Sequence, residues 1–239
     1  MGVRSAIGLF SLPFVLYGYS WSYGGRLAML IVFEGIDGSG KSTQAKMFVN
    51  WLEKEKGERA CLAFEPGGTD IGRQIRQILL SKDNDEMTPL TEALLYAADR
   101  AQHIEECVVP SIRDGFTVVC DRMFSTFAYQ GVSIDTMVLW ELNGPALWKL
   151  EPVIGVGEAV TFFLDVPVKD CIDRLSRAGK MDRMESKGYE YLVKVRDNYL
   201  KLMQSIPMVK IDCEGLTAEE VQEAIRKKYE QLMFINKGD

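Results

Sequence analysis

The chain has 239 residues, of which 47% are hydrophobic and 26% are charged, and it is expected to form one domain, or one domain with a small appendage. The net charge of −6 argues against general nucleic-acid binding, which favours a basic surface. The five cysteines are scattered, without C-x-x-C spacing. This usage favours reduced thiols in a cytoplasmic protein over a disulfide framework or a zinc site.

Residues 1–28 differ in composition from the rest and carry only two charges, at Arg4 and Arg26. Their apolar run at residues 6–19 is interrupted by Gly8 and Pro13 and is too short for a confident membrane span. We interpret this segment as an N-terminal extension, or as residues that precede a functional translation start at Met29. A targeting segment is the alternative. The domain itself is expected to cover residues 29–239.

Residues 29–33 form a short apolar run that predicts a buried strand. Residues 35–42 follow and fit G-x-x-x-x-G-K-[ST], the phosphate-binding P-loop, and residues 43–55 carry apolar side chains at helical spacing. In this context a nucleotide site is favoured over an ordinary Gly-rich turn. The loop N–H groups and the helix N-terminus would face a polyphosphate. Lys41 would reach its β- and γ-phosphates, and the Ser42 hydroxyl would ligate Mg²⁺.

Strand-like runs then alternate with helical patterns. Further strands are expected at 60–64, 116–120, 160–164 and 208–211, and helices at 71–80, 90–112, 134–150, 168–177, 188–204 and 218–234. This alternation predicts an α/β fold with a doubly wound, five-stranded parallel sheet flanked by helices, of the P-loop NTPase type with a small lid. Ligands of such a sheet bind beyond the carboxyl ends of its strands.

Polar residues follow the first four strands, in agreement with one shared site. Asp121 closes an apolar run in the Walker-B arrangement, which holds Mg²⁺ or its water, although many strands end in Asp at a turn. The neighbouring Arg122 suits bidentate phosphate binding, with a surface ion pair as the alternative. Residues 65–69, Glu-Pro-Gly-Gly-Thr, read equally well as a structural turn or as a ligand-contacting turn.

Two helical stretches could form a base-binding site. Tyr96 and Arg100 are four residues apart and share one helix face, where they could stack on a base and hold a phosphate. Thr126 and Gln130 could pair with a base edge. The alternatives are a helix–helix contact for the first pair and a capped helix start for the second stretch. His103, the only histidine, is assigned no catalytic role.

A local basic cluster is expected near residue 180. It consists of Arg174, Arg177, Lys180 and Arg183, around a break in the helical pattern at residues 178–180. Such a cluster suits a mobile loop that closes over transferring phosphates, excluding water and neutralising charge. A solvated basic turn is the competing interpretation.

In combination, these motifs resemble the thymidylate kinase family, of the nucleoside monophosphate kinase group of P-loop proteins. The resemblance covers residues 29 to about 234. It is carried by the P-loop at 35–43, Glu-Pro-Gly-Gly-Thr at 65–69, Tyr-Ala-Ala-Asp-Arg-Ala-Gln at 96–102, Asp-Arg at 121–122 with Ser-Thr-x-Ala-Tyr-Gln at 125–130, and Asp-Arg-x-Glu at 182–185. It implies transfer of phosphate from ATP to dTMP in a cytoplasmic enzyme, with Mg²⁺, without nucleic acid or membrane as a partner, and commonly as a homodimer.

The resemblance also implies residue roles. The ATP site would comprise Gly35, Ile36, Asp37, Gly38, Ser39, Gly40, Lys41, Ser42, Thr43 and Arg174, with Arg174 stacked on adenine. The dTMP site would comprise Asp37, Glu65, Pro66, Tyr96, Arg100, Arg122, Thr126, Tyr129, Asp182 and Glu185. Tyr96 would stack on thymine, Arg100 and Thr126 would pair with its edge, Arg122 would hold the phosphate and Tyr129 would disfavour a 2′-hydroxyl. Ser42 and Asp121 would hold the metal.

Members of the family place the catalytic basic residue either in the P-loop, at the position of Gly38, or in the lid. Because position 38 is glycine here, the resemblance assigns catalysis to Lys41, Asp37 and Arg122 together with the lid bases Arg177, Lys180 and Arg183, in a lid at about residues 174–187. Two departures stand out. Two residues instead of the usual three separate Arg122 from Ser125, and Ser176 stands where related lids often carry a base.

Two alternatives stay open. Another nucleoside monophosphate kinase or a deoxynucleoside kinase could share this sheet, although the stretches around Tyr96 and Gln130 favour thymine. A P-loop ATPase switch that binds a protein partner is the alternative from another class. It would lack the basic lid cluster and would need no acceptor pocket.

Overall fold

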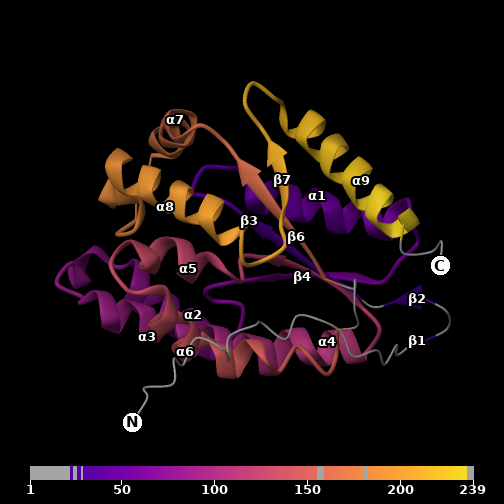
Figure 1. Ribbon diagram of the computed structural model, residues 1–239, viewed down its shortest axis with the longest axis horizontal. Coiled ribbons are helices and arrows are strands. Elements are labelled where there is room, and N and C mark those ends of the chain that lie inside the picture. Colours follow the sequence, from indigo (N-terminus) through magenta and orange to yellow (C-terminus); the bar gives the residue numbers. More distant parts are fainter. Residues whose placement is uncertain (1–21, 24–25, 28, 155–158, 180–181, 236–239) are drawn as a thin grey trace, which may run out of the picture.

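A five-stranded parallel sheet forms the centre of the protein, which is described here from a computed structural model (Figure 1). The structure describes residues 22–23, 26–27, 29–154, 159–179 and 182–235. The strands are β3 (Leu30–Glu34), β4 (Ala60–Phe64), β5 (Thr117–Asp121), β6 (Ala159–Asp165) and β7 (Val209–Asp212). Their spatial order is β4-β5-β3-β6-β7, so the P-loop strand β3 lies in the middle of the sheet.

Helices connect the strands and cover both faces. They are α1 (Lys41–Lys54), α2 (Asp70–Leu80), α3 (Pro89–His103), α4 (Val109–Arg113), α5 (Ser125–Tyr129), α6 (Thr136–Leu147), α7 (Val168–Ala178), α8 (Tyr189–Leu202) and α9 (Ala218–Ile235). In Figure 1, α1, α7, α8 and α9 lie on one side of the sheet, and α2, α3, α4 and α6 lie on the other. The predicted fold class is therefore confirmed.

Alternate residues of β3 belong to two separate hydrophobic cores. Ile31 and Phe33 pack in the core on the α1 and α9 side, whereas Leu30 and Val32 pack in the core beneath α3, α4 and α6. A strand that is buried on both faces has no polar side, which explains why its sequence reads as a continuous apolar run. The carboxyl end of β3, where Glu34 and the P-loop follow, is thereby fixed at the centre of the molecule.

The predicted helices are present, and the one at 90–112 is more irregular than expected. It begins as α3, continues through a π-helical turn at Ile104–Val108 and ends as α4. Pro110 lies just beyond this turn and has no N–H to donate, which is consistent with an irregular hydrogen-bond ladder here. Some helical segments are too short to show a periodic pattern in the sequence. They are α5 and the turns at Lys82–Asn84, Gln130–Val132 and Glu185–Lys187.

The proposed extension lies mostly outside the described residues. Its described part contains two short antiparallel strands, β1 (Ser22–Tyr23) and β2 (Arg26–Leu27), which were not predicted. Whether residues 1–28 are a start-site effect or a targeting segment stays a matter of prediction. In the part of the chain that the structure describes, no helix has the length and apolar character needed to cross a membrane.

Candidate active site

The P-loop joins β3 to the N-terminus of α1, as predicted. Lys41, the first residue of α1, is 5% exposed, and its Nζ donates a hydrogen bond of 2.9 Å to the carbonyl oxygen of Ile36. Burial, with a smaller contribution from the charge of Arg122, lowers the pKa of Lys41. A buried cation held against the loop in this way suits a polyanionic ligand, whose charge would favour the protonated amine.

Helix α7 packs directly on the P-loop at Gly38. This residue has a φ of +82°, and a Cβ atom built on it would lie 2.5 Å from the carbonyl oxygen of Cys171 in α7. Glycine is therefore required for two reasons, a left-handed backbone conformation and the lack of space for any side chain. Arg174, one turn further along α7, donates a 3.2 Å hydrogen bond to the carbonyl oxygen of Gly38.

Ser42 and Asp121 lie together, as expected for a Walker-type magnesium site. The Ser42 hydroxyl donates a hydrogen bond to Oδ2 of Asp121. Among the described residues, Oδ1 of Asp121 is buried without a hydrogen-bond partner. A hydroxyl and a carboxylate oxygen are ligands that Mg²⁺ accepts, and this ion usually takes few protein ligands because it keeps waters and binds phosphate oxygens. These two residues therefore fit the ion that the sequence predicts.

Arg122, Asp37 and Tyr129 form one network beside the P-loop. Arg122 pairs with the Asp37 carboxylate, and the Tyr129 hydroxyl donates to Oδ2 of Asp37 at 2.8 Å. The guanidinium of Arg122 also lies 4.9 Å from the centre of the Tyr129 ring. Burial alone would raise the pKa of Asp37, but the charges of Arg122 and Lys41 outweigh it and lower that pKa. Asp37 therefore stays ionised and orients the guanidinium.

The short turn after Arg122 is held by a buried carboxylate. Glu34, 0% exposed at the end of β3, accepts hydrogen bonds from the backbone N–H groups of Met123 at 2.7 Å and Phe124 at 2.6 Å. Its other oxygen accepts from the Tyr199 hydroxyl at 2.7 Å. Arg122 itself has a φ of +76°, which is unusual for a residue other than glycine. The two-residue spacing is thus accommodated by a tight turn whose two N–H groups both donate to Glu34.

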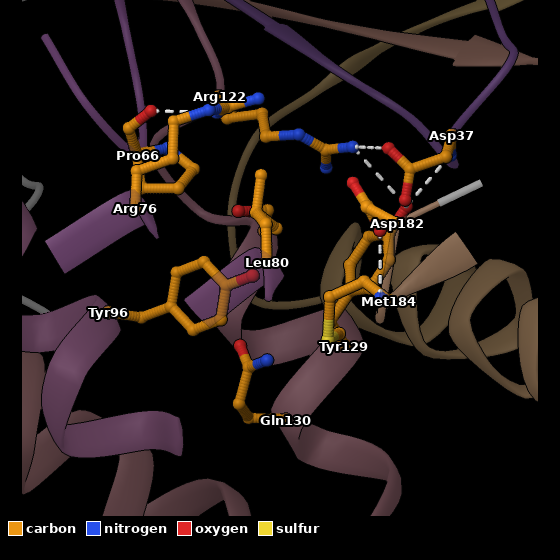
Figure 2. Close-up of a pocket in the computed structure, with 11 residues that line it drawn as sticks. Asp37, Pro66, Arg76, Leu80, Tyr96, Arg122, Tyr129, Gln130, Asp182 and Met184 are labelled. Atoms are coloured by element: carbon orange, nitrogen blue, oxygen red, sulfur yellow. Dashed lines mark hydrogen bonds and ion pairs between the residues drawn. The ribbon is translucent and has the colours of Figure 1, made fainter. Parts of the chain in front are cut away.

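A pocket opens beside this network, between the P-loop side of the sheet and helices α2 and α3 (Figure 2). Figure 2 shows the ring of Tyr96 reaching in from α3, opposite the guanidinium of Arg122 and the carboxylate of Asp37. The residues that line the pocket are Asp37, Pro66, Arg76, Leu80, Tyr96, Arg122, Ser125, Tyr129, Gln130, Asp182 and Met184. An aromatic surface at one end and a cation at the other suit a planar base attached to a phosphate.

Of the ten residues predicted for the acceptor site, six line this pocket. They are Asp37, Pro66, Tyr96, Arg122, Tyr129 and Asp182. The four others, Glu65, Arg100, Thr126 and Glu185, do not belong to the lining. Arg100 and Thr126 are 1% and 0% exposed, so neither side chain is open to the pocket here, and their pairing with a base edge stays a prediction.

Glu65 and Arg100 belong instead to a buried polar cluster under the pocket wall. Oε2 of Glu65 lies 2.9 Å from Nε of Arg100, and Oε1 lies 3.0 Å from Nδ1 of His103. Arg100 also donates to the side-chain oxygen of Asn143, and the Asp99 carboxylate accepts the N–H of Gly67 at 2.9 Å. These contacts hold the turn at 65–69 and thereby place Pro66 in the wall.

The basic cluster is divided between two places. Arg174 and Arg177 lie on α7 and are exposed, and Lys180 lies outside the described residues. Arg183 is only 6% exposed, and its Nη2 pairs with Oε2 of Glu92 at 2.6 Å. The expectation that Arg183 sits on a mobile loop with free charge is therefore wrong for this structure, because a buried ion pair already uses that charge.

Comparison with known proteins agrees with this geometry. A profile of the thymidylate kinase family matches residues 33–225. The chain belongs to the thymidylate kinase family. It is 39% identical over 220 residues to the thymidylate kinase of Geobacter sp. strain M21, a match that covers 86% of this chain and 95% of that protein. It is 41% identical over 181 residues to the thymidylate kinase of Pelotomaculum thermopropionicum, covering 74% and 81% of the two chains.

A solved structure supports the same assignment. The crystal structure of thymidylate kinase from Ehrlichia chaffeensis matches with a TM-score of 0.65 and 27% sequence identity, covering 86% of this chain and all of that one. As a member of this family the chain is a phosphotransferase, and the predicted family and enzyme class are confirmed.

The structure adds lining residues that the sequence analysis missed. Arg76 and Leu80 of α2, and Met184 beyond α7, line the pocket without having been predicted. Arg76 donates a 2.8 Å hydrogen bond to the carbonyl oxygen of Pro66. Helical spacing could have indicated Arg76. Gly72 packs against Asp99, and Arg76 follows Gly72 by one helical turn, so Arg76 lies on the face of α2 that contacts the motif around Asp99.

The buried cluster predicts a specific pH dependence of stability. Burial, and then the charge of Glu65, raise the pKa of Asp99 to about 6. A carboxyl whose pKa is higher in the folded than in the unfolded state destabilises the fold as it ionises, so the penalty is absent below about pH 4 and complete well above pH 6. Asp99→Asn should therefore gain about 2–3 kcal/mol relative to wild type between pH 4 and pH 8, because the pKa shift is about two units.

Urea unfolding of both proteins at the two pH values measures this difference. Asp197→Asn, at an exposed position on α8, is the control and should show no such trend. An Asp99→Asn advantage that stays constant or shrinks with rising pH would contradict the assignment.

Proposed function

We propose that the chain transfers the γ-phosphoryl group of ATP to the phosphate of dTMP, with Mg²⁺, giving ADP and dTDP. The observation that carries this proposal is the position of the acceptor pocket. Its cationic end, formed by Arg122, adjoins the P-loop through the Arg122–Asp37 pair, and its aromatic end is formed by Tyr96. Membership of the thymidylate kinase family supports the identity of both substrates.

The donor would bind along the P-loop. The backbone N–H groups of residues 35–43 and the N-terminus of α1 would hold the phosphates, and Lys41 would turn from the Ile36 carbonyl to a phosphate oxygen. Ser42 and Asp121 would hold Mg²⁺, which neutralises charge on the phosphate oxygens when bound. Arg174, now bonded to the carbonyl of Gly38, lies where α7 flanks the loop and is assigned to the adenine.

The acceptor would lie across the pocket. Arg122 would take its phosphate, with Asp37 fixing the guanidinium. The Tyr96 ring would stack on the base, and Tyr129, which is hydrogen-bonded to Asp37, would pack against the sugar. Gln130 lines the base end and offers an amide to the base edge. Arg100, Thr126, Glu65 and Glu185 would act from outside the lining, as supports of these contacts.

The chemistry requires little beyond position and charge. The nucleophile would be a phosphate oxygen that is already anionic at pH 7, so no general base is needed, in keeping with the burial of His103 away from the pocket lining. The transferring group gathers negative charge in the transition state, and fixed cations stabilise it. Arg122 and Lys41 supply part of this charge, and exposed lid bases would complete it.

A coupled ADP-release assay over a panel of nucleoside monophosphates tests the proposed reaction. We expect Mg²⁺-dependent release with dTMP, because the pocket matches a pyrimidine with a phosphate. Release that needs no acceptor would identify an ATPase switch. A preference for AMP, CMP or an unphosphorylated deoxynucleoside would identify another kinase of this group.

Of the proposed lid bases that the structure describes, Arg177 is the exposed one, in the last turn of α7. Arg177→Ala should lower kcat by on the order of 10²-fold, because a charge that stabilises the transition state is lost. Steady-state kinetics with saturating ATP and dTMP measure the effect. Lys169→Ala removes an exposed base from the first turn of the same helix and is the matched control. Full turnover in the Arg177 variant would exclude its catalytic role.

We also propose that the protein is a cytoplasmic homodimer. The free cysteines among the described residues and the use of ATP support the cytoplasm. Exposed apolar side chains lie on helices that pack side by side, α2 with α3 and α3 with α6. They are Ile71, Ile78, Leu90, Leu94, Met137 and Val138. Exposed apolar side chains gathered on neighbouring helices are typical of a protein–protein contact.

Leu94→Asp should therefore convert a dimer to a monomer, because the substitution places a charge in an apolar interface. Light scattering after size exclusion measures the mass. Leu216→Asp, at an exposed apolar residue outside these helices, should leave it unchanged. A wild-type protein that is monomeric at micromolar concentration would contradict the proposed dimer.

A further inference from the structure

A buried carboxylate on α3, Glu92, lies at the centre of contacts that the sequence analysis did not anticipate. It is 4% exposed, and its oxygens accept hydrogen bonds from three side chains outside α3. Gln130 donates from Nε2 at 2.9 Å, Arg183 donates from Nη2 at 2.6 Å, and the Nζ of Lys187 lies 3.1 Å from Oε2. Glu92 is therefore the common acceptor for the base end of the pocket and for the segment that follows α7.

The bond to Gln130 fixes the orientation of its amide. Burial would raise the pKa of Glu92, but the hydrogen bond from Gln130 and the charges of Lys187 and Arg183 outweigh it and lower that pKa. An ionised carboxylate only accepts hydrogen bonds, so Gln130 must turn its NH₂ group toward Glu92. Its carbonyl oxygen then faces away from Glu92, and Figure 2 shows that oxygen directed toward the ring of Tyr96.

The bond to Arg183 holds a second part of the pocket. Asp182 and Met184, the neighbours of Arg183 in sequence, both line the pocket. Arg183 is fixed at three points: Nη2 to Glu92, Nε to the carbonyl oxygen of Leu79 at 2.8 Å, and the backbone N–H to that of Leu80 at 3.3 Å. Leu80, the last residue of α2, also lines the pocket, so this anchor joins the lining residues Asp182 and Met184 to a third lining residue.

We propose that Glu92 is a positioning residue that sets acceptor selectivity, by locking the Gln130 amide with its oxygen toward the base and by holding residues 182–184 against the pocket through Arg183. This inference rests on the proposed function and assigns Arg183 to an anchor instead of to the transferring phosphate. A carbonyl oxygen presented to the base accepts the N3–H of thymine, whereas the unprotonated N3 of cytosine would face it with like polarity.

Glu92→Gln tests the inference, because an amide at position 92 can donate as well as accept and so lets the Gln130 amide turn over. We expect the KM for dTMP to rise on the order of tenfold, and the ratio of kcat/KM for dTMP to that for dCMP to fall by a similar factor, with a smaller change in kcat. Glu105→Gln removes an exposed carboxylate from the adjoining helical turn, where it pairs with Lys149 at 3.5 Å, and should change neither value.

Arg183→Met separates the two contributions. It leaves the carboxylate and its bond to Gln130 in place, so the KM for dTMP should rise while the dTMP to dCMP ratio stays at the wild-type value. Arg183→Lys should restore much of the lost affinity because it retains a positive charge. If circular dichroism shows that Glu92→Gln does not fold, Glu92→Asp provides a milder variant that keeps the charge. It should change the dTMP to dCMP ratio less than it changes the KM for dTMP.

Calorimetric binding of dTMP to wild type and to each variant gives a readout that does not depend on turnover. A folded Glu92→Gln protein with wild-type dTMP affinity and wild-type selectivity would overturn the inference while leaving the proposed function intact. A wild-type protein that neither binds nor phosphorylates dTMP would overturn both. Reduced dTMP binding and reduced selectivity in Glu92→Gln, with both values unchanged in Glu105→Gln, would support the inference.

Discussion

The site depends on the hydrogen bonds that Glu34 makes at the end of the central strand. This side chain is buried, which raises its pKa, and both of its oxygens accept hydrogen bonds, from Met123 and Phe124 at one and from Tyr199 at the other. Through these bonds one residue joins the P-loop strand β3, the turn after β5 and helix α8. The turn carries Arg122, and the backbone of β3 leads to Asp37, so the pairing of these two residues follows from how Glu34 is satisfied.

The same principle explains the wall on the other side of the pocket. Asp99 and Glu65 are buried, and each contacts groups that also shape the turn at residues 65–69: Asp99 accepts the N–H of Gly67, and Glu65 lies against Arg100 and His103. Glu92 repeats the arrangement for the segment after α7. The pocket is thus built less by apolar packing than by buried carboxylates that each collect donors from distant parts of the chain. Such networks favour one arrangement, because each donor that is lost leaves a buried carboxylate oxygen without a partner.

The fold could be predicted because its strands are continuous apolar runs and its helices have regular spacing, and the P-loop and Asp121 follow strand ends where parallel sheets place their ligands. Tyr96 was also predicted, from a motif. Arg183 was misplaced, and the buried partner of Arg100 was missed, because a sequence shows that a residue is charged but does not show which carboxylate faces it in the fold. Glu92 was missed for the complementary reason: a lone acid in the first turn of a helix is typical of a solvated helix start.

The contact between Gly38 and Cys171 links the P-loop to helix packing in a further way. The space that a side chain at position 38 would need is occupied by the main chain of α7, and no change at Cys171 can remove a carbonyl oxygen. A loop that carries its own arginine and a helix seated this close are therefore alternative solutions. A change from one to the other would require α7 to move, so a substitution at position 38 alone could not place an arginine in this loop.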